Sequence, residues 1–252
     1  NKQQQHQTVR KNVQVVAQVD LEREFVMRIR LKFSKTGPVK FVGHLDTMRL
    51  FQRAVKVANV PVAYSQGFSP HSLVYFALPL GVGVQSMGDY MEIVTAIDVD
   101  PTVVKDNLNA VLVNGIHIED AFKIGDKSDS LMSLVQAADY EVLIQKTEGV
   151  TLELIQNKLA ADSLVIMKKG KAGIRPVDLK PMLLECNVCE KEEGILIDMH
   201  VLAGSSSNLN PDLFVKALLE GEVAEYEIRV TRKEMYTADG DTYIPLDTFG
   251  RE

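Results

Sequence analysis

The chain has 252 residues, of which 46% are hydrophobic and 25% charged, as in ordinary globular proteins. No apolar run reaches the roughly 18 residues that are needed to span a bilayer, and the polar, Gln-rich start lacks the apolar core of a signal peptide. Two cysteines are too few for a disulfide framework. These features exclude the membrane-spanning and disulfide-rich secreted classes. They predict a cytoplasmic protein without membrane contact, and no motif calls for a cofactor.

The positive charge is concentrated in residues 27–71. That stretch holds eight of the 28 Lys and Arg residues and only one of the 34 acidic residues, Asp46, so its formal charge is +7. Residues 72–252 contain 16 basic and 30 acidic residues, a formal charge of −14. Because random placement would mix the signs, this segregation favours a surface that meets an anionic partner. The partner that the sequence predicts is RNA, an acidic protein or the chain's own acidic part.

The first elements in chain order carry most of these cations. Alternation in residues 27–33 predicts a strand with one side in the core and with Arg28, Arg30 and Lys32 on the other side. Residues 43–58 predict a helix that exposes Arg49 and Arg53. A short extended piece at 39–42, strands at 73–78, 90–97 and 116–122, and a helix at 100–113 that Asp100 caps are also expected.

The remaining elements repeat the same order. Strands are expected at 140–144, 164–168, 182–188, 195–202 and 225–231, and helices at 151–161 and 210–219. The basic segment KKGKAGIR is expected to be a loop. Both parts therefore have the order β-α-β-β-α-β, the second with extra strand material, and this order is ferredoxin-like. The predicted fold is α+β, with two ferredoxin-like halves packed together: a polar leader at 1–24, a first half at 25–126 and a second half at 127–252.

The loop YSQGFSPH at residues 64–71 combines hydroxyl, amide and imidazole groups with two aromatic rings. Such a loop can stack a base on an aromatic ring and hold a phosphate with hydroxyl and backbone N–H groups. The alternative is a tight turn with Phe68 buried beneath it. The residues predicted to bind RNA or phosphate are Arg28, Arg30, Lys32, Lys35, Arg49, Arg53, Tyr64, Ser65, Gln66, Phe68, Ser69, His71, Lys171 and Arg175. For the cations, the alternatives are a solvated face, an exposed hairpin around residue 171, or pairing with the acidic half.

Catalytic and metal sites have weaker signals. Leu45-Asp46 resembles the Leu-Asp of pseudouridine synthases, whose Asp is catalytic, and His44 is a candidate base beside it. The alternative for Asp46 is a first-turn position with an ion pair to Arg49. Cys186 and Cys189 have metal-like spacing, but no second pair of ligands completes a tetrahedral site, so no metal is expected.

Several segments resemble the family of radical SAM-linked proteins, a domain of unknown function encoded beside or fused to radical SAM proteins. The matching segments are KFSKTGPVKFVGHLDTMRLFQRAVKVANVPVAYSQGFSPHSLVYFALPLGVGVQSMGDY, RPVDLKP, AGSSSNLNPDLFVKAL and RKEMY. The resemblance implies a bacterial cytoplasmic accessory domain. Because the chain lacks the Cys-x3-Cys-x2-Cys of a radical SAM enzyme, it would be the partner of that enzyme.

The expected function is therefore non-catalytic: the chain would bind RNA or another phosphate-bearing substrate for a radical SAM protein. Two alternatives stay open. One is an RNA-modifying enzyme that resembles pseudouridine synthases and uses Asp46, and the other is a protein–protein docking module.

Overall fold

The computed structural model describes residues 27–125, 129–170 and 173–252. The predicted leader at 1–24 and the predicted phosphate ligand Lys171 lie outside the described residues. Within these ranges, every helix is too short or too polar to cross a membrane.

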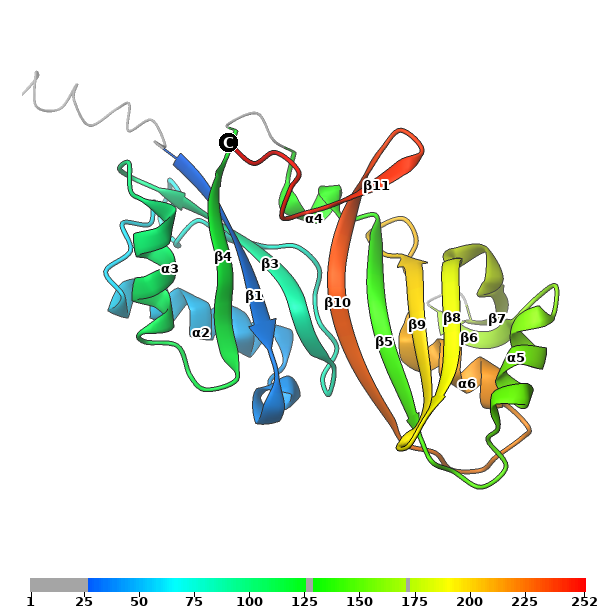
Figure 1. The fold of residues 1–252 in the computed structure, drawn as a ribbon. Coiled ribbons are helices and arrows are strands. Elements are labelled where there is room, and N and C mark those ends of the chain that lie inside the picture. Colours follow the sequence, from blue (N-terminus) through cyan, green and yellow to red (C-terminus); the bar gives the residue numbers. More distant parts are fainter. Residues whose placement is uncertain (1–26, 126–128, 171–172) are drawn as a thin grey trace, which may run out of the picture.

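A large mixed sheet organises the described chain (Figure 1). Its strands follow the order β4-β1-β3-β10-β5-β9-β8, with β2 paired to β3 and β11 paired to β10, and β6 and β7 form a separate hairpin. The strands are β1 (Met27–Lys35), β2 (Val74–Phe76), β3 (Gln85–Thr95), β4 (Ile116–Ile124), β5 (Ala137–Gln145), β6 (Val165–Gly170), β7 (Gly173–Asp178), β8 (Leu183–Lys191), β9 (Gly194–Leu202), β10 (Ile228–Asp239) and β11 (Thr242–Pro245). The fold therefore belongs to the α+β class, which confirms the predicted fold class.

Side-chain caps begin four of the described helices, α3, α4, α5 and α6. Asp100 accepts a hydrogen bond from the backbone N–H of Thr102 at 2.8 Å, and Asn210 accepts one from Leu213 at 3.1 Å. The predicted extended piece at 39–42 is wrong, because Pro38 opens a short 3₁₀ helix there. The helices are η1 (Gly37–Phe41), α2 (His44–Val57), α3 (Pro101–Asn109), α4 (Leu131–Leu134), α5 (Leu152–Ala160), η2 (Lys180–Met182) and α6 (Pro211–Leu219).

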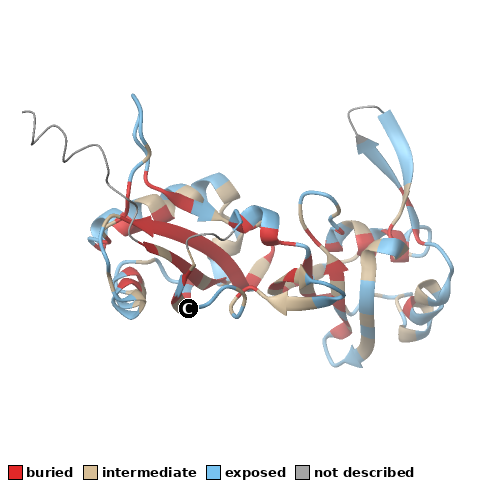
Figure 2. Ribbon diagram, turned by 90° about the horizontal axis from the view of Figure 1, so that it is seen from above, coloured by how far each residue is buried: buried red, intermediate tan, exposed pale blue. Residues whose placement is uncertain are grey.

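In the first half (residues 27–125) and in the second (residues 129–252) a helix packs on the same face of the sheet; α2 and α6 are drawn behind the strands in Figure 1. In the first half, Ile29 and Leu31 of β1 pack with Phe51 of α2 and Leu108 of α3. In the second half, α6 packs on the apolar sides of β5 and β9. Figure 2 shows the buried residues following these strands and their helix contacts. The opposite face of the sheet carries polar residues, among them the paired Arg30 of β1 and Glu92 of β3.

The two halves meet where β3 and β10 run parallel. Only the pairs Thr231↔Gln85 and Arg232↔Ser86 form this ladder among the described residues. Gly88 of β3 lies so close to β10 that a Cβ placed on it would be 2.3 Å from the carbonyl oxygen of Lys233. A glycine is therefore required for the two strands to approach.

Two elements depart from the sequence prediction in ways that matter for function. The expected basic loop is largely the β6–β7 hairpin, which Figure 2 shows projecting as an exposed pair of strands. The final predicted strand is longer and is followed by β11, after which the chain returns to β1 and β4 of the first half. The last residues therefore cross the boundary that was predicted at 126/127.

Candidate functional site

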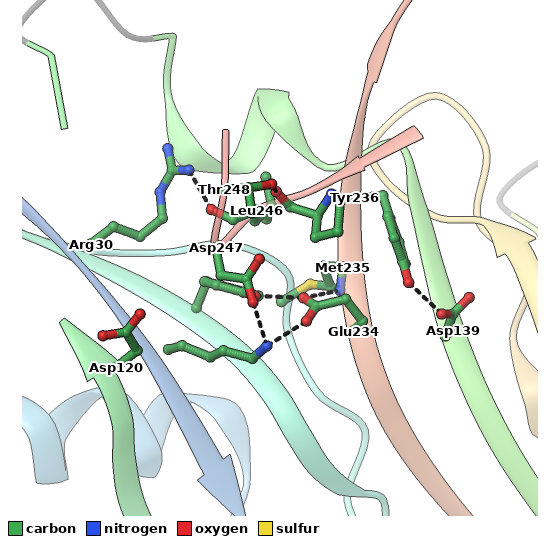
Figure 3. Close-up of polar contacts among 12 residues, drawn as sticks. Arg30, Asp120, Asp139, Glu234, Met235, Tyr236, Leu246, Asp247 and Thr248 are labelled. Atoms are coloured by element: carbon green, nitrogen blue, oxygen red, sulfur yellow. Dashed lines mark hydrogen bonds and ion pairs between the residues drawn. The ribbon is translucent and has the colours of Figure 1, made fainter. Parts of the chain in front are cut away.

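The cations of β1 are neutralised within the molecule. Arg28 donates from Nη2 to Glu92 Oε2 at 2.6 Å, and Arg30 donates from Nε to Glu92 Oε1 at 3.0 Å. Arg30 also donates from Nη1 to the carbonyl oxygen of Leu246 at 2.8 Å (Figure 3) and to that of Phe249 at 2.7 Å. Arg30 is 0% exposed. It therefore has no surface on which to meet an external anion.

Lys32 and Lys35 are also occupied. Lys32 donates to Glu234 at 2.5 Å and to Asp247 at 2.8 Å, and the dashed lines from these two carboxylates converge in Figure 3. Burial alone would lower the pKa of Lys32, but the hydrogen bonds to Asp247 and Glu234 and the negative charges of these two groups together raise it. Lys35 is buried and donates to the carbonyl oxygen of Val42, and burial lowers its pKa.

The prediction that β1 presents three cations in a row to solvent is therefore wrong. The sheet face on which they lie is occupied by Glu92 of β3, Glu234 of β10 and the chain after β11. Pairing with the acidic half was the alternative, and for Lys32 it is what the structure contains.

The cations of α2 remain at the surface, as predicted. Arg49, Arg53 and Lys56 are all exposed, and they lie on one side of the helix because they are spaced at intervals of three and four residues. Arg49 and Arg53 border a pocket of about 420 Å³ between α2 and the chain that follows α3. Its remaining lining residues are Asp46, Leu50, Ala54, Val57, Val111 and Val113.

The electrostatics of this pocket favour an anion. Arg49 Nη1 lies 2.9 Å from Asp46 Oδ1, with both side chains largely exposed. Arg53 has no ion pair or hydrogen bond to another residue in the described ranges. The pocket therefore combines two guanidinium groups and one carboxylate over an apolar floor, which suits a ligand with an anionic group and an apolar ring or chain.

The loop at residues 64–71 is held at its base and exposed at its tip. Ser65 Oγ lies 2.8 Å from His71 Nδ1 and accepts a hydrogen bond from the His71 backbone N–H at 3.1 Å. Gly67 has a φ of +116°, which suits glycine at this bend. Phe68 is fully exposed and Tyr64 is 42% exposed, so the alternative with Phe68 buried beneath the loop is wrong. Gln66 and Ser69 are also exposed.

The last predicted phosphate ligand, Arg175, lies in β7 directly opposite Lys168 of β6, and both are exposed. Two like charges at facing positions repel each other. This hairpin and α2 belong to different halves, so the structure divides the exposed predicted cations between two places.

The catalytic candidates Asp46 and His44 have different partners. Asp46 lies in the first turn of α2 with an ion pair to Arg49, as the alternative prediction described. His44 packs against the ring of Phe76, with centroids 5.7 Å apart, and burial lowers its pKa. Cys186 and Cys189 are free thiols, and no cluster suited to a metal ion occurs among the described residues.

Sequence reasoning missed the polar groups that β10 places at the junction. Tyr90 donates to Glu234 at 2.5 Å, and Arg232 forms a buried ion pair with Asp89. The alternation of polar residues in RKEMY could have indicated a polar strand face, but the partners lie more than 140 residues away in the chain.

Comparisons with known proteins give a family and distant structural likenesses. Residues 28–211 match the family described as "Uncharacterized protein conserved in bacteria (DUF2344)". No curated protein matches the sequence. The crystal structure of a Cbf5-Nop10-Gar1 complex is similar with 11% identity and a TM-score of 0.46, over 88% of this chain and 52% of that chain, so this chain spans about half its length. The crystal structure of an unknown protein from Galdieria sulphuraria has 14% identity and a TM-score of 0.23, over 82% and 98% of the two chains. Both TM-scores lie below 0.5, and neither likeness identifies the fold.

Proposed function

The chain belongs to a family of uncharacterised proteins conserved in bacteria, and we propose that it is a non-catalytic accessory protein that binds RNA or another phosphate-bearing substrate. Its site would be the exposed side of α2 together with the loop at residues 64–71. Its partner would be a radical SAM protein in the bacterial cytoplasm, which the sequence resemblance supports.

One observation carries this proposal. Arg53 and Arg49 border the 420 Å³ pocket, whereas Arg30 and Lys32 of β1 form ion pairs with carboxylates of the same chain. Arginine suits a phosphate because its guanidinium group presents several donors in a plane. Each phosphate contact also releases condensed counterions when the partner is RNA. The guanidinium groups of Arg49 and Arg53 are therefore accessible to a phosphate, whereas that of Arg30 is buried.

The loop supports the same proposal. Phe68 is fully exposed at the tip of this loop, so its ring is accessible to a base. Stacking of a base on an aromatic ring contributes about 1–3 kcal/mol per base. Arg175 and Lys168 would provide a second contact for a long RNA, because a phosphate between them would relieve their repulsion.

A filter-binding titration against total RNA tests the proposal. We expect Arg49→Glu/Arg53→Glu to weaken binding at low salt by at least tenfold and to lower the slope of log affinity against log salt by about 1 per lost contact. The matched control is Lys146→Glu/Lys191→Glu, which makes the same change in net charge at exposed positions of the second half. Absence of binding, or equal effects of the two double variants, would contradict the proposal.

A docking module is the second candidate, and a separate surface favours it. Phe41, Leu45 and Val82 are each about two-thirds exposed, and Val82 adjoins Gly43 while Phe41 adjoins Gly83. Leu45 and Val82 are aliphatic and do not stack with bases, and a phenylalanine beside aliphatic side chains is typical of protein–protein contacts, so this patch suits a protein surface. Co-purification with a radical SAM protein after nuclease treatment, lost in Leu45→Asp but kept in Arg49→Glu/Arg53→Glu, would support docking instead.

An RNA-modifying enzyme is the third candidate, because Asp46 lines the same pocket as Arg49 and Arg53. It predicts that Asp46→Asn removes a uridine modification while RNA binding is kept. A variant that retains both would exclude this role for Asp46.

We also propose that each half is ferredoxin-like. The strand orders β4-β1-β3-β2 and β10-β5-β9-β8 support this, because the two halves place corresponding strands in corresponding positions.

A further inference from the structure

A histidine, a carboxylate and a tyrosine form a connected group on the sheet face opposite the helices. His200 of β9 lies beside Asp139 of β5 in the ladder, and its Nδ1 is 2.5 Å from Asp139 Oδ1. Tyr236 of β10 donates from its hydroxyl to Asp139 Oδ2 at 2.5 Å (Figure 3). Three adjacent strands of the second half therefore contribute one residue each to this group.

The hydrogen bond to Asp139 decides which nitrogen of the imidazole is available. A carboxylate accepts, so in the neutral form of the imidazole Nδ1 carries the hydrogen and Nε2 is the acceptor. The ring is held in place by Tyr236 and Tyr243, whose centroids lie 5.0 and 5.1 Å away in edge-to-face contact. Nε2 makes no hydrogen bond to another residue in the described part of the chain.

His200 also borders a pocket of about 360 Å³, which falls in the size range of small-molecule sites. Glu185 and Asp198 contribute carboxylates to its lining, and Asn187 contributes an amide. Lys233 also lines the pocket, and its Nζ lies 3.6 Å from Glu141 Oε2, which offsets its charge. Negative charge therefore dominates the pocket, which disfavours phosphate and favours a ligand with positive charge.

We propose that this pocket binds a small organic amine, with His200 Nε2 as the acceptor for one of its N–H groups. Asp139 fixes the tautomer of the ring, Tyr236 holds Asp139, and the carboxylates of Glu185 and Asp198 balance the charge of the ligand. The site lies on the sheet face away from α2, so a bound amine and a phosphate-bearing partner would not compete for the same residues.

Spermidine is a suitable probe, used with the full chain at 150 mM NaCl. Isothermal titration should detect saturable binding, and long-range proton–nitrogen NMR should show His200 with hydrogen on Nδ1 and with an Nε2 signal that moves on titration. We expect His200→Phe to weaken binding about tenfold or more, because the hydrogen bond from the charged donor is lost. Phenylalanine has no acceptor but keeps a ring beside Tyr236 and Tyr243, so the variant tests the acceptor rather than the packing.

Two controls separate a specific site from attraction of any polycation. Glu119→Gln removes an exposed negative charge from the first half and should leave the affinity unchanged. Magnesium chloride at matched ionic strength should not move the His200 signals, because the described residues contain no metal-binding cluster. The proposal would be overturned if Glu119→Gln and His200→Phe had equal effects, or if magnesium shifted the His200 signals as much as spermidine does. Hydrogen on Nε2, or no binding at 10 mM spermidine (roughly the upper limit for a specific small-ligand site), would overturn it as well.

Discussion

Arg232 of β10 and Asp89 of β3 form a buried ion pair across the junction of the two halves. Their side chains are 1% and 7% exposed, and Arg232 also donates to the carbonyl oxygen of Leu78 at 3.1 Å. The two residues are 143 positions apart in the chain. Because the β3–β10 ladder has only the two pairs Thr231↔Gln85 and Arg232↔Ser86 among the described residues, this ion pair adds a further contact between the halves.

Removing one member of this pair should destabilise the protein. We expect Arg232→Met to cost about 3–5 kcal/mol in the free energy of unfolding, because Asp89 would keep a buried charge without a partner. Urea unfolding followed by circular dichroism measures the effect. The double variant Asp89→Leu/Arg232→Met should recover much of the loss, since it buries no charge. A single variant within 1 kcal/mol of the parent, a small part of the expected cost, would show that the pair does not bear on stability.

The close approach of β3 and β10 predicts a specific intolerance at Gly88. Gly88→Ala should destabilise the protein by at least about 2 kcal/mol, because its Cβ would meet a backbone oxygen that cannot move without parting the strands. Gly81→Ala is the matched control, since its Cβ would make an ordinary 3.4 Å contact with Val84. Thermal unfolding of both variants checks the prediction. Equal losses at the two positions would indicate that the strands can separate at little cost.

Phe68 should contribute to binding and not to stability. Phe68→Ala removes a fully exposed ring, so the free energy of unfolding should change by no more than about 0.5 kcal/mol. If the ring stacks on a base, RNA affinity should fall by about 1–3 kcal/mol, or roughly 5- to 150-fold. Ile97→Ala, at another largely exposed apolar position, should affect neither quantity. Unchanged RNA affinity in Phe68→Ala would remove the loop from the proposed site.

The thiol of Cys186 should react slowly in the folded protein. Burial raises its pKa from 9.0 to about 11, which leaves roughly a hundredfold less thiolate at pH 8 than an ordinary thiol has. Iodoacetamide labelling of a Cys189→Ser variant, native and in urea, measures the difference. Between pH 9.0 and about 11 the unfolded chain loses this proton first, so stability should fall as pH rises through that range. Equal labelling rates in both states would contradict the raised pKa.

Local structure was largely predictable. The alternation of β1, the proline and cap residue that open α3 and α6, and the exposed side of α2 depend on neighbours within a few positions. The exposure of Arg49 and Arg53 follows from the same helical periodicity. The exceptions are local too: η1 replaces an extended piece because Pro38 suits a first helical turn.

The candidate site was only half predictable, because its electrostatics depend on distant residues. Lys32 is neutralised by Glu234 and Asp247, which are 202 and 215 positions away, and the cation and its partners show no local pattern that relates them. His200 was not selected from the sequence for the same reason. Its partner Asp139 is 61 positions away, and the pair forms only because β9 lies next to β5.

Sequence by itself determined the elements, the amphipathic faces and the concentration of positive charge near the start of the chain, because these depend on residue type and short spacing. Tertiary structure alone decided which of those charges are free. Strand pairing brings carboxylates and carbonyl oxygens from the end of the chain onto β1 and leaves α2 uncovered. The physical reason is that an ion pair forms wherever folding places opposite charges within a few ångströms, whatever their separation along the chain.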